Sequence, residues 1–100
     1  MAKAYWVVCY REVRRPDSLV AYAKLAGPAI QAAGGRALVR GMPAGVREAG
    51  IVQRTVIIEF DDLEKARAAY DSPAYRAALA ALAALGDDAE RDIRFVEGEG

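Results

Sequence analysis

Four short segments that favour β-strands alternate with helical patterns in one fixed order along the chain. The strand-like segments are rich in β-branched and aromatic residues and occupy residues 4–10, 36–40, 54–60 and 92–97. Helical periodicity follows the first of them, and a second helical region follows the third. The order strand-helix-strand-strand-helix-strand predicts an antiparallel four-stranded sheet with both helices on one face.

This plan is the α+β ferredoxin-like fold, and we expect residues 1–100 to form a single domain of it. Asp17 is expected to cap the first helix, and Gly34-Gly35 is expected to end it. Gly27-Pro28 predicts a kink or a broken turn in that helix, because proline has no backbone N–H. Pro73 divides the second helical region into two pieces, the later one ending near Leu85.

The strands carry apolar side chains on both faces of the predicted sheet. These residues are Trp6, Val7, Val8, Val56, Ile57, Ile58, Phe95 and Val96. Two helices can cover only one face, and a large apolar surface left in water marks an interaction site. The pattern therefore predicts a homodimer in which two sheets pack against each other.

The composition excludes several kinds of catalytic site. The chain has no His and no Asn, and its single cysteine is Cys9. Ser-His-Asp and Cys-His arrangements cannot be built without His, and zinc sites draw on Cys and His. We therefore expect neither a metal nor a cofactor. One cysteine allows no internal disulfide, which fits a cytoplasmic protein.

Charge and hydropathy narrow the range of partners. The chain has 14 Lys and Arg against 14 Asp and Glu, whereas nucleic-acid binders need a basic excess. Residues 1–50 carry eight basic and three acidic side chains, and residues 51–100 carry six and eleven. This asymmetry indicates differently charged surfaces, surfaces of opposite sign that help two copies dock, or a basic pocket for a small anion. The longest uncharged apolar stretch, residues 77–85, is too short to span a bilayer. We expect neither nucleic-acid nor membrane binding.

The chain contains four recognisable motifs, which are Gly34-Gly-Arg-Ala-Leu-Val-Arg-Gly41, Arg54-Thr-Val-Ile-Ile-Glu-Phe60, Tyr70-Asp-Ser-Pro-Ala-Tyr75 and Val96-Glu-Gly98. Together they resemble the domain-of-unknown-function family 1330. That family belongs to the dimeric α/β-barrel superfamily, so the resemblance implies the same fold and a sheet-to-sheet dimer. The superfamily also includes cofactorless monooxygenases and muconolactone isomerases, but the family itself has no settled activity.

The chain departs from the family pattern after Tyr75. Basic residues that many members carry there correspond to Leu79 and Leu82 in this sequence. If those basic residues bind a ligand elsewhere in the family, this chain lacks them unless Arg76 takes their place.

Arg40 and Arg54 are the first candidate ligand-binding residues, because they lie on strands that should be neighbours. In a regular strand, Arg40 shares a face with Arg36. The planar guanidinium suits a bidentate clamp for a carboxylate. The alternative is that both arginines form internal ion pairs with Glu59 or Glu48.

Glu59, Ser72 and Tyr75 complete the candidate site. Glu59 lies within an apolar strand, where burial would raise its pKa and suit it to act as a catalytic base. Alternatively, Glu59 forms an ion pair with an arginine. The hydroxyls of Ser72 and Tyr75 flank a predicted helix start and can hold an anionic oxygen, or else serve in capping and packing.

Two functional hypotheses follow from these residues. In the first, a pocket between sheet and helices binds a small organic anion, with or without cofactor-independent isomerase or oxygenase chemistry. In the second, the chain is a non-catalytic structural or stress-response homodimer. The sequence leaves open whether the protein is an enzyme.

Overall fold

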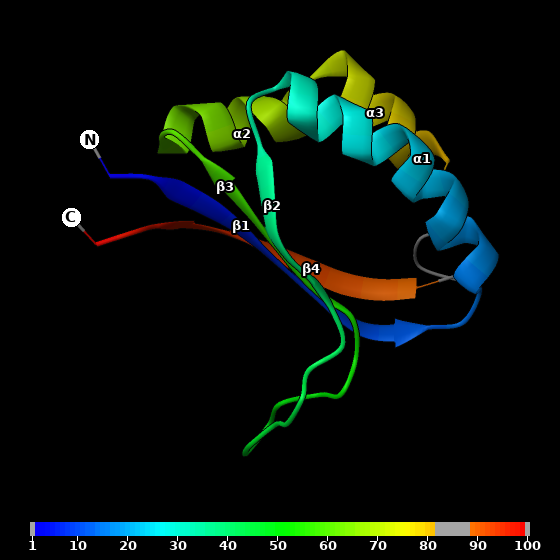
Figure 1. Cartoon of the computed structure of the whole chain (residues 1–100). Coiled ribbons are helices and arrows are strands. Elements are labelled where there is room, and N and C mark those ends of the chain that lie inside the picture. The colour runs from blue at the N-terminus through cyan, green and yellow to red at the C-terminus, as the bar shows by residue number, and fades with distance from the viewer. Residues whose placement is uncertain (1, 82–88, 100) are drawn as a thin grey trace.

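The computed structural model describes residues 2–81 and 89–99, which form one antiparallel sheet with helices packed on one of its faces (Figure 1). The elements are β1 (Ala4–Val13), α1 (Pro16–Ala32), β2 (Arg36–Gly41), β3 (Thr55–Phe60), α2 (Leu63–Asp71), α3 (Pro73–Ala80) and β4 (Ala89–Glu97). The strand order is β2-β3-β1-β4, so β1 and β3 are central and β2 and β4 form the edges. The predicted ferredoxin-like fold is confirmed.

Helix α1 differs from the sequence prediction at its start and in its middle. It begins at Pro16 with Arg15 in the N-cap position, so the prediction that Asp17 caps it is wrong, and Asp17 lies in the first turn. The helix is continuous through Pro28, so the expected broken turn is absent. Pro28 has no backbone N–H to donate to the carbonyl of Lys24. Lys24 is exposed, so water can take the place of that donor. Gly34, with a φ of 92°, ends the helix as predicted.

Helices α2 and α3 are separated by a short break at Ser72, as the sequence predicts. Asp62 caps α2 by accepting a hydrogen bond of 2.8 Å from the backbone N–H of Lys65. Pro73 is the first residue of α3, where its missing N–H costs nothing. The predicted end of this region near Leu85 and Gly86 lies outside the described residues.

The hydrophobic core lies between the sheet and the helices, with Trp6 at its centre. Trp6 is 1% exposed, and its indole N–H donates a hydrogen bond of 2.8 Å to the carbonyl of Ala66. Its ring centroid is 5.0 Å from that of Tyr75 and 5.4 Å from that of Phe60. These aromatic contacts fix the distance between the sheet and the α2–α3 pair.

A β-bulge in β2 changes which of its side chains face the helices. Arg36 pairs with Glu59 and Ala37 with Ile58, but the next pair joins Val39 to Ile57, so Leu38 is an extra residue. Arg40 then pairs with Val56 and lies on the helix-facing side. The prediction that Arg36 and Arg40 share a face is wrong, because the bulge reverses the alternation between them.

The outer face of the sheet, opposite the helices, is apolar in its middle. It carries Tyr5, Val7, Cys9, Val39, Ile57 and Val96. Val39 and Val96 are 44% and 45% exposed. The loop of residues 42–54 extends from the sheet away from the helices (Figure 1). The prediction that both faces of the sheet carry apolar side chains is confirmed.

Candidate functional site

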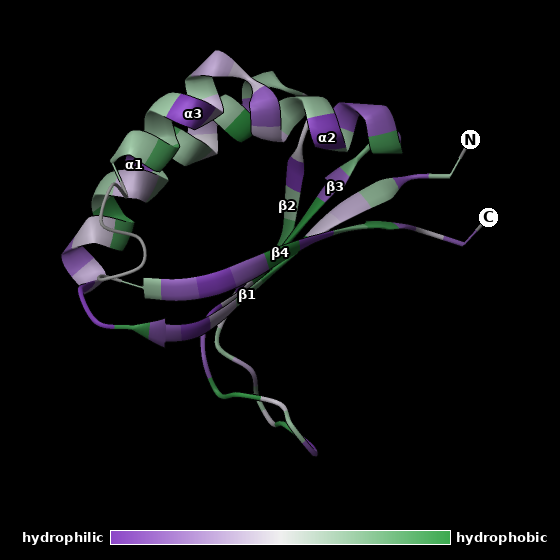
Figure 2. Cartoon of the chain, turned by 180° about the vertical axis from the view of Figure 1, so that it is seen from behind, coloured by the Kyte–Doolittle hydropathy of each residue, from purple (hydrophilic) through white to green (hydrophobic). Residues whose placement is uncertain are grey.

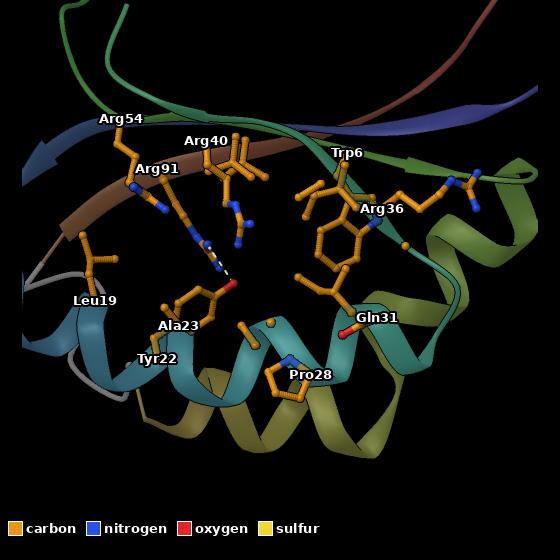
Figure 3. Close-up of a pocket in the computed structure, with 18 of the residues that line it drawn as sticks. Trp6, Leu19, Tyr22, Ala23, Pro28, Gln31, Arg36, Arg40, Arg54 and Arg91 are labelled. Carbon is orange, nitrogen blue, oxygen red and sulfur yellow. Dashed lines mark hydrogen bonds between the residues drawn. The ribbon is translucent and has the colours of Figure 1, made fainter.

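A cavity of about 850 Å³ lies between α1 and the helix-facing side of the sheet (Figure 3). Strands β1, β2 and β3 form its floor, and Arg91 reaches it from β4. Its polar and charged lining residues are Tyr10, Tyr22, Gln31, Arg36, Arg40, Arg54 and Arg91. Among the described residues, no Asp or Glu lines the cavity. Its volume falls in the range of roughly 300–1,000 Å³ typical of small-molecule sites.

The cavity exists because α1 presents small residues to this part of the sheet. Ala23, Ala26 and Gly27 line it where larger side chains would otherwise fill the space. On the opposite wall Ala37 is the β2 residue beside Ile58. Every residue of β2 before Gly41 is exposed, so the cavity opens to solvent along this edge strand.

Arg91 is held by three tyrosines at one end of the cavity. Its Nη1 donates hydrogen bonds of 3.1 Å to the hydroxyl of Tyr10 and 3.2 Å to that of Tyr22. Its Nη2 donates to the hydroxyl of Tyr75 at 3.1 Å. The hydroxyls of Tyr22 and Tyr75 also share a short hydrogen bond. We call these four residues the tyrosine–arginine cluster.

Burial raises the pKa of two phenols of this cluster, those of Tyr10 and Tyr75. It raises the pKa of Tyr10 above its ordinary value of 10.0, although the Arg91 charge opposes the shift. Burial also raises the pKa of Tyr75, and the neighbouring Tyr22 adds to that effect. For Arg91, burial alone would lower the pKa, but the oxygens of the three tyrosines outweigh it and the pKa is raised. At neutral pH Arg91 therefore keeps its charge, and Tyr10 and Tyr75 keep their protons.

Arg40 and Arg54 extend from the sheet into the same cavity (Figure 3). Arg54 lies just before β3, and its carbonyl accepts a hydrogen bond of 3.0 Å from the backbone N–H of Tyr10. Neither guanidinium forms an ion pair with an acidic residue in the described part of the chain. The internal ion pairs with Glu59 or Glu48, considered above as an alternative, are thus not formed.

Glu59 lies on the other side of the sheet. Its carboxylate is 3.0 Å from Nη2 of Arg36 and accepts a hydrogen bond of 3.3 Å from the hydroxyl of Tyr5. Arg36 borders the cavity, but its guanidinium points away from it toward Glu59 and Asp61 (Figure 3). The structure therefore does not bring Glu59 together with Arg40 and Arg54, and its expected role as a base in that pocket has no geometric support.

Ser72 and Tyr75 lie behind the cavity wall rather than on it. The Ser72 hydroxyl accepts a hydrogen bond of 3.2 Å from the backbone N–H of Tyr75 and donates one of 2.8 Å to the carbonyl of Ala69. This is the capping role considered in the sequence analysis. Tyr75 is fully buried, and its hydroxyl reaches Arg91. Arg76 is 66% exposed beside Asp71 and does not line the cavity.

Sequence reasoning missed Arg91, Tyr22 and the role of Tyr10. The signal was present, because Arg91, Ile93 and Phe95 alternate along one face of β4. The predicted last strand began at residue 92, whereas β4 begins at Ala89, so Arg91 was left outside the pattern.

Within the described ranges, no three His, Cys, Asp or Glu side chains come together in a group able to hold a metal ion. No helix among the described residues is long and apolar enough to cross a membrane.

The family described as Domain of unknown function (DUF1330) matches residues 3–99. The chain belongs to the DUF1330 family. The resemblance found in its motifs is thereby confirmed, whereas no curated protein matches the chain.

Solved structures similar to this DUF1330 chain share its fold. The RPA0582 protein of unknown function from Rhodopseudomonas palustris has a TM-score of 0.73 and 14% identity, covering 99% of this chain and 84% of its own. A dimeric ferredoxin-like protein of unknown function from Thermobifida fusca has a TM-score of 0.65 and 23% identity, covering 97% and 92%. A putative antibiotic biosynthesis monooxygenase from Caulobacter crescentus has a TM-score of 0.59 and 14% identity, covering 99% and 92%.

Proposed function

We propose that this DUF1330 protein binds a small organic anion in the cavity between α1 and the sheet. The observation that carries the proposal is the convergence of Arg40, Arg54 and Arg91 on a cavity with no acidic lining residue in the described chain. Like charges that converge without a counterion repel one another, and a bound carboxylate removes that repulsion. Arginine also offers two parallel donors to a carboxylate.

The tyrosines support the same proposal. The hydroxyls of Tyr10 and Tyr22 accept from Arg91, which leaves the phenolic hydrogen of Tyr10 available for donation. The hydrogen of Tyr22 is available when Tyr75 is the donor in the bond that the two hydroxyls share. Both residues line the cavity, so they can donate to an anionic oxygen placed there. This arrangement supports binding better than turnover, because the predicted base Glu59 lies on the opposite face and the chain has no His.

Thermal-shift screening with small carboxylates tests the proposal. A ligand at about 100 times its Kd stabilises the folded protein by about 2.7 kcal/mol. Arg40→Ala and Arg54→Ala should each weaken binding roughly tenfold to a hundredfold, the effect of losing charge-assisted hydrogen bonds. Arg76→Ala, which changes an exposed arginine outside the cavity, is the control. Stabilisation that is the same in all three variants would refute the assignment.

Isomerase or oxygenase chemistry without a cofactor is the second candidate. It is supported by the fold shared with proteins named as putative monooxygenases and by a cluster of phenols around a cation. Oxygen consumption with any carboxylate found by the screen tests the oxygenase chemistry, and the appearance of a rearranged product of the same mass tests the isomerase chemistry. Oxygenase chemistry is supported if Tyr22→Phe still binds the carboxylate but no longer consumes oxygen. Binding without turnover excludes oxygenase chemistry for that ligand.

The proposal includes a homodimer formed through the outer face of the sheet. Val7 and Ile57 pair at the centre of that face. The exposed Val39 lies beside Ile57, Arg94 lies beside Val7, and the exposed Val96 lies in the next row beside Tyr5. The similar protein from Thermobifida fusca is described as dimeric. Sedimentation should give about 21 kDa, twice the 10.7 kDa of one chain, and Val7→Lys should shift the mass toward that of the monomer.

A cytoplasmic location is also proposed, because the single Cys9 allows no internal disulfide.

A further inference from the structure

The cavity floor changes from apolar to charged along the direction of the strands. Its side chains form three rows across the sheet, set by the strand pairing. The first row contains Trp6, Ile58 and Ala37, the second contains Val8, Val56 and Arg40, and the third contains Tyr10, Arg54 and Arg91. The first row is entirely apolar, and the third row has two cations and a phenol.

Helix α1 repeats this gradient on the facing wall, apart from Gln31, which lines the cavity near Trp6. Tyr22 lies at the charged end, where its hydroxyl contacts Arg91. Ile30 lies at the apolar end, because a methyl group added at Gly35 would meet both Ile30 and Ile58 within about 3 Å. Figure 3 shows Arg54, Arg91 and Tyr22 at one end of the cavity and Trp6 at the other. The hydropathy colouring of Figure 2 shows that the first half of β4, the part that carries Arg91, is mostly hydrophilic.

The rows set the length of ligand that the cavity fits. Adjacent rows are two residues apart on β1 and β3, or about 6.7 Å, and three apart on β2 because of the bulge at Leu38. The first and third rows are therefore roughly 13 Å apart. A compact inorganic anion would occupy only the charged end and leave Val56, Ile30 and Ile58 without a partner. An extended ligand reaches both ends.

We propose that the cavity selects amphipathic carboxylates, whose carboxylate binds at Arg54 and Arg91 and whose hydrocarbon body lies along Val56 and Ile58 toward Ala37. This inference rests on the proposed anion-binding function and adds the class of ligand. Arg40, in the middle row, then borders the junction between the anionic group and the hydrocarbon.

Calorimetric titration of the full chain with linear alkanoates from acetate to decanoate tests the inference. Each methylene that becomes buried should tighten Kd about fourfold, until the chain spans the cavity and the gain stops. Primary alkanamides of matched length, which keep the body but lack the charge, should bind at least tenfold more weakly than the alkanoates.

The outcomes separate the two proposals. Equal Kd values for acetate and decanoate would overturn the amphipathic ligand and leave the anion site in place. Absence of binding by every alkanoate, or equal binding of amides and carboxylates, would overturn the anion site itself.

A charged substitution at the apolar end provides a second test. Ala37 is an exposed small residue, so Ala37→Asp places a carboxylate beside the predicted hydrocarbon without filling a packed site. It should raise the Kd of decanoate at least tenfold relative to that of acetate. Ala21→Asp adds the same charge on α1 outside the cavity and should leave both values unchanged. An unchanged ratio in Ala37→Asp would also overturn the inference.

Discussion

Replacing Arg91 with Met should destabilise the fold by about 2–4 kcal/mol, even without a ligand. Arg91 donates three hydrogen bonds to Tyr10, Tyr22 and Tyr75, and bonds to a charged group contribute roughly 1.5–3 kcal/mol each. Removing a guanidinium from water costs several kcal/mol, which offsets part of the stabilisation by these hydrogen bonds. Met keeps most of the stem volume, and Tyr22 and Tyr75 keep their mutual hydrogen bond. The hydroxyl of Tyr10 loses its only hydrogen-bond partner among the described residues.

Urea denaturation followed by the fluorescence of Trp6, the single tryptophan, measures this effect. Protein concentration must be held constant, because a dimer unfolds in a concentration-dependent way. For a domain of this size the loss corresponds to a melting temperature lower by roughly 8–30 °C. Arg76→Met removes an exposed arginine 4.0 Å from Asp71 and should change stability by less than about 0.5 kcal/mol. Equal stability of the two variants would show that the phenols do not offset the burial of Arg91.

Three further perturbations have defined outcomes. The pKa of Tyr75 is raised above 10.0, so above pH 10 the native state holds a proton that the unfolded chain releases. The contribution of Tyr75 to the free energy of unfolding is therefore complete below pH 10 and falls as the pH rises above it. At about pH 11 this loss is about 1.4 kcal/mol, and urea midpoints should show a smaller loss in Tyr75→Phe than in the wild type. Ser72→Ala removes the cap of α3 and should cost about 1 kcal/mol in the same assay, a cost that an unchanged midpoint would disprove. Gly35→Ala places a methyl 2.6 Å from Cγ2 of Ile30 and should cost roughly 1–3 kcal/mol, whereas Gly41→Ala meets nothing within 4 Å and serves as its control.

The fold was predictable because each strand and helix carries its own local signal. The alternation in and just before β3, for example, puts Arg54 and Ile58 on one face and Glu59 on the other, as in the structure. The same alternation already separates Glu59 from Arg54. Grouping the two in one pocket followed their shared strand and not the face that each residue occupies.

Only part of the candidate site was predictable, because it depends on the register of β2 and on contacts between residues far apart in the sequence. The bulge at Leu38 is invisible to an alternating pattern, and it alone decides that Arg40 faces the cavity. The tyrosine–arginine cluster joins β1, α1, α3 and β4, whose members are up to 81 residues apart. Contacts of that kind follow from the assembled fold and not from any local motif.

The bulge in β2 also affects how relatives of this chain should be aligned. Leu38 is the one residue of the strand without a counterpart on β3, so its deletion would leave Arg36 opposite Glu59 and Arg40 opposite Val56. A relative with a regular second strand is thus expected to carry its cavity arginine three positions after the arginine of the Gly-Gly-Arg motif, instead of four. An alignment without a gap at this point would match that arginine to Val39, a residue of the opposite face. Loss of a ligand-binding residue would then be inferred for a protein that has kept it.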